Sequence, residues 1–125
     1  MELATYPLDR SFQAQGEARS ATCGSHLKLG LDCHADGSIA VLGIAAHACA
    51  VGQASAAVFA GGAMGKNSAE IADAEAALSS WLSDKNGAIP DWPRLKMIAA
   101  ARAYPARHGA MLLPWRAAVA ALVGL

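Results

Sequence analysis

The chain has 125 residues, of which 54% are hydrophobic and 16% charged, and its ten basic and ten acidic residues give a formal net charge of zero. This length fits one domain that can bury a core without disulfides or a structural metal. Because the basic residues are scattered and matched by acidic ones, the composition argues against a surface for nucleic acid or for an anionic membrane. The 31 alanines, about a quarter of the chain, favour helices.

The apolar stretches and the cysteines indicate an intracellular protein. The longest apolar stretch, residues 39–51, is shorter than the roughly 20 residues needed to cross a bilayer. The N-terminal residues lack the basic segment and the following apolar segment of a secretory signal. Three cysteines without a repeated spacing argue against a disulfide framework. We therefore expect a cytoplasmic protein with reduced thiols and no membrane partner.

The first predicted elements are two β-strands joined by a tight turn. Residues 25–33 alternate apolar and polar side chains, which is the period of a half-buried strand. Asp36-Gly37 accommodates the positive φ of a hairpin turn, and a second strand is expected over residues 38–47. A further short strand, within residues 15–23, is expected to extend this antiparallel hairpin.

Four helices are predicted after the strands. Each is delimited by a start or stop signal, such as a cap residue, paired glycines or a proline. The four cover residues 50–62, 67–84, 90–103 and about 109–122. Pro114 is expected to be tolerated near the first turn of the last helix.

The order of these elements, strands first and helices afterwards, predicts an α+β fold. We expect a small antiparallel sheet of about three strands, with four to five helices packed on one face. The pattern predicts a single domain over residues 21–125, preceded by an N-terminal arm over residues 1–20, where no period is sustained.

Cys23 and Cys49 are the two cysteines whose sequence positions indicate an accessible or reactive thiol. Cys23 precedes the hairpin, where its neighbour Gly24 leaves the sulfur accessible. Cys49 lies where strand gives way to helix, and the N–H groups at a helix start stabilise a thiolate, the form that binds metals. A small buried hydrophobe is the alternative role for either cysteine. Cys33, on the apolar face of a strand, is expected to belong to the core.

Among the four histidines, His108 is the main candidate for a site because it lies at the mouth of the last helix. His47 lies two residues before Cys49, hence on the same face if the strand continues, where it could support a ligand. His26 and His34 are expected to be solvated. The chain contains none of the standard short motifs for zinc, phosphate or acyl-transfer chemistry.

Three short segments carry a resemblance to a known family. They are Thr22-Cys23-Gly24-Ser25, residues 48–55 (ACAVGQAS) and residues 104–115 (YPARHGAMLLPW). Taken together, in this order and spacing, they resemble the ligand loops of the iron–sulfur cluster assembly scaffold family, IscU and the N-terminal domain of NifU, and especially its SufU-like branch. The resemblance spans about residues 20–122 and implies a SufE/NifU-like fold. It also implies a cysteine desulfurase and apo-protein acceptors as partners, and a monomer or homodimer.

Two positions depart from the family's pattern. Gly109 stands where the family has its third cysteine, and Ser25 stands where it has an aspartate. The resemblance thus implies a divergent member that lacks the third cysteine. In such a member Cys23, Cys49 and His108 would supply two sulfurs and one nitrogen to the metal.

Three functions stay open at this point. The first is a scaffold that binds iron or a [2Fe–2S] cluster through the three side chains just named and passes it to acceptor proteins. The second is a SufU-like, zinc-dependent sulfur acceptor for a cysteine desulfurase, although the family's nucleophile position is Gly109 here. The third is a metal-free interaction protein of the assembly machinery. The chain is not expected to be an enzyme, apart from the sulfur-transfer role that the second function includes.

Overall fold

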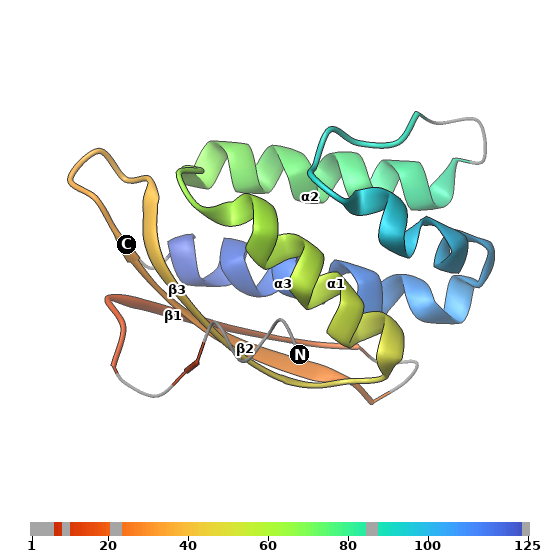
Figure 1. Ribbon diagram of the computed structural model, residues 1–125, viewed down its shortest axis with the longest axis horizontal. Helices are drawn as coiled ribbons and strands as arrows, with labels where there is room; N and C mark the ends of the chain where they lie inside the picture. The colour runs from red at the N-terminus through yellow and green to blue at the C-terminus, as the bar shows by residue number, and fades with distance from the viewer. Residues whose placement is uncertain (1–6, 9–10, 21–23, 85–87, 124–125) are drawn as a thin grey trace.

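The computed structural model describes residues 7–8, 11–20, 24–84 and 88–123. A three-stranded antiparallel sheet forms one layer, and the helices that follow it in sequence form a second layer on one face (Figure 1). The expected α+β fold is thereby confirmed. The elements are β1 (Ala14–Arg19), β2 (His26–Cys33), β3 (Ile39–His47), α1 (Ala50–Ala63), α2 (Ser68–Ser83), the 3₁₀ helices η2 (Leu95–Ala103) and η3 (Pro105–Arg107), and α3 (His108–Val123).

The strands of the sheet follow the order β1-β2-β3, and alternation along β2 decides which face is buried. Leu27, Leu29 and Leu31 are all buried under the helices, as the period of two predicts. The hairpin turn also forms as expected, with Gly37 at φ +88°. Asp36 accepts hydrogen bonds from the hydroxyl and the backbone N–H of Ser38, and these bonds hold the pKa of its carboxyl below the ordinary value.

The edge strand β1 lies within the range expected as an N-terminal arm. Residues 14–19 pair with β2 along their whole length. The predicted strand exists, but it lies toward the start of the range 15–23.

Phe12, just before β1, also belongs to the folded part of the chain. Gly30 and Gly43 are register partners on the outer face of the sheet, and a Cβ at either position would collide with the Phe12 ring. Phe12, which is 9% exposed, therefore covers this patch of the sheet.

Helices α1, α2 and α3 form within two residues of their predicted ends. The third predicted helix differs, because it is a 3₁₀ helix that begins only at Leu95. Arg94 takes a left-handed conformation (φ 63°), and the indole Nε1 of Trp92 donates to the backbone oxygen of Val58 at 3.0 Å. Residues 90–93 are therefore held against α1 and do not start a helix.

The position of Pro114 in its helix also differs from the expected one. Helix α3 begins at His108, and the proline falls in its second turn. A proline there lacks the N–H that would bond to the carbonyl of Ala110. The next carbonyl, that of Met111, accepts a hydrogen bond from Ser55 Oγ of α1 at 2.5 Å.

The core is built around three aromatic rings from different elements. Phe59 and Trp92 stack with ring centroids 5.6 Å apart, and Trp115 meets both rings edge-on at 5.4 and 5.3 Å. All three side chains are at most 6% exposed. Aromatic pairs in these geometries stabilise a core beyond the area that they bury.

Small alanine side chains in α3 allow this helix to lie close to the sheet. A Cβ on Gly16 of β1 would collide with backbone atoms of Ala117 and Ala121 in α3. Only a glycine facing small residues permits this approach of helix and strand. Among the described residues, no helix is long and apolar enough to cross a membrane.

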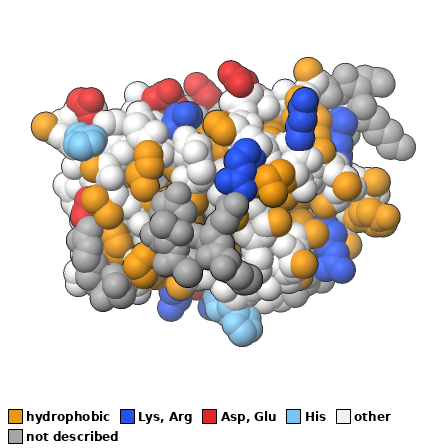
Figure 2. Space-filling model, viewed as in Figure 1, with side chains coloured by type: hydrophobic (Ala, Val, Ile, Leu, Met, Phe, Trp, Pro, Cys, Tyr) orange, Lys and Arg blue, Asp and Glu red, His pale blue; other side chains and the backbone are white. Residues whose placement is uncertain are grey.

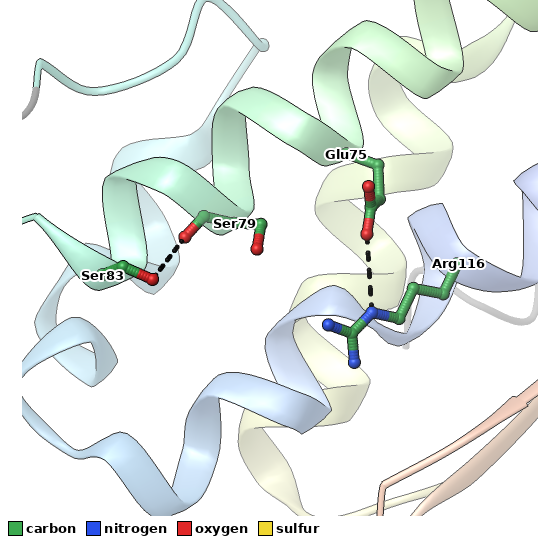
Figure 3. Close-up of polar contacts among 4 residues, drawn as sticks. All are labelled: Glu75, Ser79, Ser83 and Arg116. Atoms are coloured by element: carbon green, nitrogen blue, oxygen red, sulfur yellow. Dashed lines mark hydrogen bonds and ion pairs between the residues drawn. The ribbon is translucent and has the colours of Figure 1, made fainter.

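Polar contacts hold α2 on the side facing α3 and at its end. Arg116 Nε of α3 lies 3.5 Å from Glu75 Oε1 of α2, and within α2 the Ser83 hydroxyl donates to the Ser79 carbonyl (Figure 3). Acidic side chains gather along the edge of the molecule that α2 forms (Figure 2).

Asn67→Ala should lower the free energy of unfolding by about 1 kcal/mol. Asn67 Oδ1 accepts from the backbone N–H of Glu70 at 2.9 Å, and Glu70 Oε1 accepts in return from the backbone N–H of Asn67 at 3.2 Å. Alanine keeps its own backbone N–H but removes the side-chain oxygen, so the backbone N–H of Glu70 would lose its partner. Urea denaturation measures the effect, with Asn67→Ser as the variant that retains a cap; equal losses in both variants would contradict a capping role.

Candidate functional site

Three segments meet at one end of the sheet, which lies at the right in Figure 1. The backbone N–H of Ser20, at the end of β1, donates to the carbonyl of Ser25 at 2.8 Å. The hydroxyl of Ser25 in turn accepts from the backbone N–H of Cys49 at 3.3 Å. A Cβ placed on Gly109 would lie 2.8 Å from Ser20 Oγ. The loop before β2, the start of α1 and the start of α3 are thus joined through a few short contacts.

The first turns of α1 and α3 also pack directly on each other. A Cβ on Gly52 would lie 3.7 Å from Ala110 Cβ, and Ser55 donates to Met111 one turn further along. These contacts fix the start of α1, where Cys49 lies, relative to the start of α3, where His108 lies.

Cys49 is the N-cap residue of α1, and its side chain makes no capping hydrogen bond. Its thiol is free and half-buried. The residue borders an open hollow of about 440 Å³. The other residues that line this hollow are Gly24, Ser25, Ala46, His47, Ala48 and Gln53. A thiol at a helix start, beside a hollow, is placed to bind a soft ion or to receive sulfur.

His108 is the first residue of α3, and its ring is held from behind. Its Nε2 lies 2.7 Å from the backbone oxygen of Arg102. A carbonyl oxygen only accepts, so Nε2 carries the hydrogen and Nδ1 carries the lone pair. A histidine oriented by such a bond to a backbone carbonyl is a typical metal ligand.

The two positions that depart from the family's pattern have structural roles here. Ser25 is 3% exposed, and its hydroxyl holds the backbone of Cys49. Gly109 offers no side chain, and the hydroxyl of Ser20 stands where a larger residue would need room. The sequence alone could not reveal either contact, since both join residues that are far apart in the chain.

Cys33 lies at the opposite end of β2 from this site. Its side chain is half-buried and packs against the core. Burial, followed by the nearby charges of Asp32 and Asp36, raises the pKa of the Cys33 thiol. A smaller thiolate fraction at neutral pH makes it a poorer ligand and nucleophile.

Cys23, the other thiol expected at the site, lies outside the described residues. Among the residues that are described, no three His, Cys, Asp or Glu side chains come close enough to hold a metal ion together. Of the three expected ligands, only Cys49 and His108 lie among the described residues, and Gly109 offers no side chain where the family has its third cysteine.

His47, which the sequence placed near Cys49 as a residue that could support a ligand, stacks on His26. The two rings stack with centroids 5.1 Å apart. His26 is half-buried and His47 exposed. The pairing follows from the register of β2 and β3, which places the two residues opposite each other.

Comparison with known proteins shows similarity at the level of structure. No family model and no curated protein matches the sequence. A NifU-like protein (N-terminal) from Brucella abortus superposes with a TM-score of 0.81 and 27% identity, over 98% of this chain and 88% of the other. A putative iron–sulfur cluster assembly scaffold protein for the SUF system, from Fervidobacterium islandicum AW-1, has the same fold, with a TM-score of 0.73 and 21% identity over 97% and 93% of the two chains.

The described parts of the three segments named from the sequence occupy one end of this shared fold. Two of their candidate donors, Cys49 and His108, lie at the adjacent starts of α1 and α3. This structural similarity supports the resemblance to the NifU-, IscU- and SufU-like iron–sulfur cluster assembly scaffold proteins that the sequence segments carry.

Proposed function

We propose that this protein holds iron or a [2Fe–2S] cluster as cargo and passes it to acceptor proteins. The observation that carries the proposal is the convergence of the Ser25 loop, Cys49 and His108 at one end of the sheet. In this proposal Cys23 supplies the second sulfur, because it lies two residues before Ser25, whose hydroxyl is bonded to Cys49.

The donor set suits a cargo that must leave again. Thiolate sulfur is the preferred ligand of iron–sulfur clusters, whereas imidazole nitrogen binds iron less firmly in such sites. Cys23 and Cys49 would hold the cargo, and His108 would be the ligand that yields. With Gly109 in place of a cysteine, a fourth position stays open to a partner's thiol or to solvent. We therefore expect weaker retention than a site with three cysteines gives.

The partners follow from the family. We propose a cysteine desulfurase as sulfur donor, apo-proteins as acceptors and the cytoplasm as location, with the chain acting as a monomer or homodimer.

Cys49→Ala should abolish the visible absorbance of protein reconstituted anaerobically with ferrous iron and sulfide, because it removes a thiolate ligand. Cys33→Ala is the matched control, since Cys33 lies at the far end of β2 and should leave the absorbance within about 20% of wild type. Transfer of the absorbance to an apo-ferredoxin, separated by size, tests the second half of the proposal. A colourless wild-type protein, or equal absorbance in both variants, would refute cargo binding at this site.

The sulfur-acceptor function is separated by mass spectrometry after incubation with a cysteine desulfurase and cysteine. The proposed scaffold role predicts no lasting persulfide on the protein alone. A mass increase of one sulfur atom on Cys49, in protein that retains zinc and no iron, would favour the sulfur acceptor instead.

A further inference from the structure

His26 and His47 form a histidine pair on the outer face of the sheet, the face turned away from the helices. They are direct register partners on β2 and β3, and their rings lie in parallel contact, with a 17° angle between the planes. Their neighbours Leu27 and Ala46 point to the opposite, inner face, because side chains alternate along a strand. The pair therefore stands at the surface, outside the Cys49–His108 site.

The charged neighbours of the pair leave it accessible. Arg19 on β1 is the register partner of His26, and its guanidinium lies 3.2 Å from the carboxylate of Glu17. This ion pair lies along β1 and not across the two imidazoles. On its other side, His47 borders the hollow of about 440 Å³ that Cys49 also lines.

We propose that His26 and His47 together bind a divalent first-row transition metal ion, with neither Cys49 nor His108 as a ligand. Residues directly opposite on antiparallel strands have Cβ atoms about 5 Å apart, a spacing from which two imidazoles can reach one ion. Neutral imidazole is the commonest protein ligand of such ions and suits zinc, copper, nickel and iron. Water completes the coordination shell on the solvent side.

The stacked arrangement of the His26 and His47 rings is the one that the site adopts when no metal ion is bound. His47 is exposed, and His26 is only half-buried, so each ring can turn between ordinary rotamers and offer one nitrogen to the same ion. Because both ligands belong to paired strands, the ion meets a backbone that is already ordered. That order reduces the entropy lost on binding.

The position of the histidine pair beside the Cys49 hollow indicates a function in iron loading. An ion held there lies at the rim of the open hollow that Cys49 also lines. The pair would receive ferrous iron before the iron reaches the thiols. This use rests on the proposed function, whereas the metal site itself does not.

Zinc titration of the Cys49→Ala protein by NMR tests the pair without competition from the intact thiol site. The imidazole signals of His26 and His47 should shift together, and His26→Gln or His47→Gln should each weaken zinc binding by at least about tenfold. His34→Gln is the matched control, since His34 lies in the exposed hairpin turn at the other end of the strands, and it should leave the affinity unchanged.

Two results would overturn the site: zinc affinity unchanged in both pair variants, or a loss in only one of them. Circular dichroism confirms that the variants are folded. Failure of the proposed function looks different, since a wild-type protein that holds no iron–sulfur cluster could still bind zinc at this pair. The loading role is tested by the initial rate of cluster formation at limiting ferrous iron, which His47→Gln should lower at least threefold and His34→Gln should not.

Discussion

Combining Gly109→Cys with Ser20→Ala is expected to lengthen the lifetime of a bound iron–sulfur cluster at least about tenfold. The cysteine restores a third thiolate at the start of α3, next to His108. On its own its Cβ would lie 2.8 Å from Ser20 Oγ, which is closer than real Cβ atoms approach. Removing that hydroxyl leaves Ser20 Cβ at 3.5 Å as the nearest atom, which is an ordinary contact. The decay of visible absorbance under a chelator, after anaerobic reconstitution, measures the lifetime.

The single variants make this prediction specific. Ser20→Ala alone should leave the cluster lifetime at the wild-type value, because it adds no ligand. Gly109→Cys alone should lower the melting temperature, and it should retain the cluster less well than the double variant. If the double variant loses its cluster as fast as wild type, then position 109 does not face the cargo.

The second large effect concerns the core. Trp115→Ala is expected to lower the free energy of unfolding by about 3–5 kcal/mol. The side chain is 1% exposed and meets the rings of Phe59 and Trp92, so alanine would leave a cavity lined by both. Urea denaturation monitored by far-ultraviolet circular dichroism measures the loss.

Trp115→Phe separates ring packing from hydrogen bonding. Among the described residues, the indole Nε1 of Trp115 is buried without a hydrogen-bond partner. Phenylalanine keeps an aromatic ring and removes this N–H, so it should cost less than half of what alanine costs. Val123→Ala, at a side chain that is 79% exposed, should cost less than about 0.5 kcal/mol. Equal losses for phenylalanine and alanine would show that an aromatic ring at this position does not by itself stabilise the core.

Most of the fold could be predicted from local sequence patterns. Alternation in β2, the Asp36-Gly37 turn and the Asn67 cap each depend on neighbours within a few residues, and each formed as predicted. The 3₁₀ helix η2 could not be told from an α-helix, because buried residues three apart, such as Leu95 and Ile98, fit both helices.

Contacts between distant segments are what the sequence could not provide. The edge strand β1 is defined by its pairing with β2 and by the approach of α3 to Gly16, and its own residues have little periodicity. At the site, the positions of Cys49 and His108 at helix starts were predictable from local signals. The bond from Ser25 to Cys49, and the stacking of His26 on His47, depend on register and packing that one sequence does not display.

Iron content of the chain purified under strictly anaerobic conditions is the decisive measurement for cargo binding. We expect iron bound to wild type and to Cys33→Ala, little in Cys49→Ala, and more in the variant that combines Gly109→Cys with Ser20→Ala. Wild-type protein that carries no iron, and takes up none on reconstitution even with the third cysteine restored, would contradict a cargo site at the start of α1 and α3.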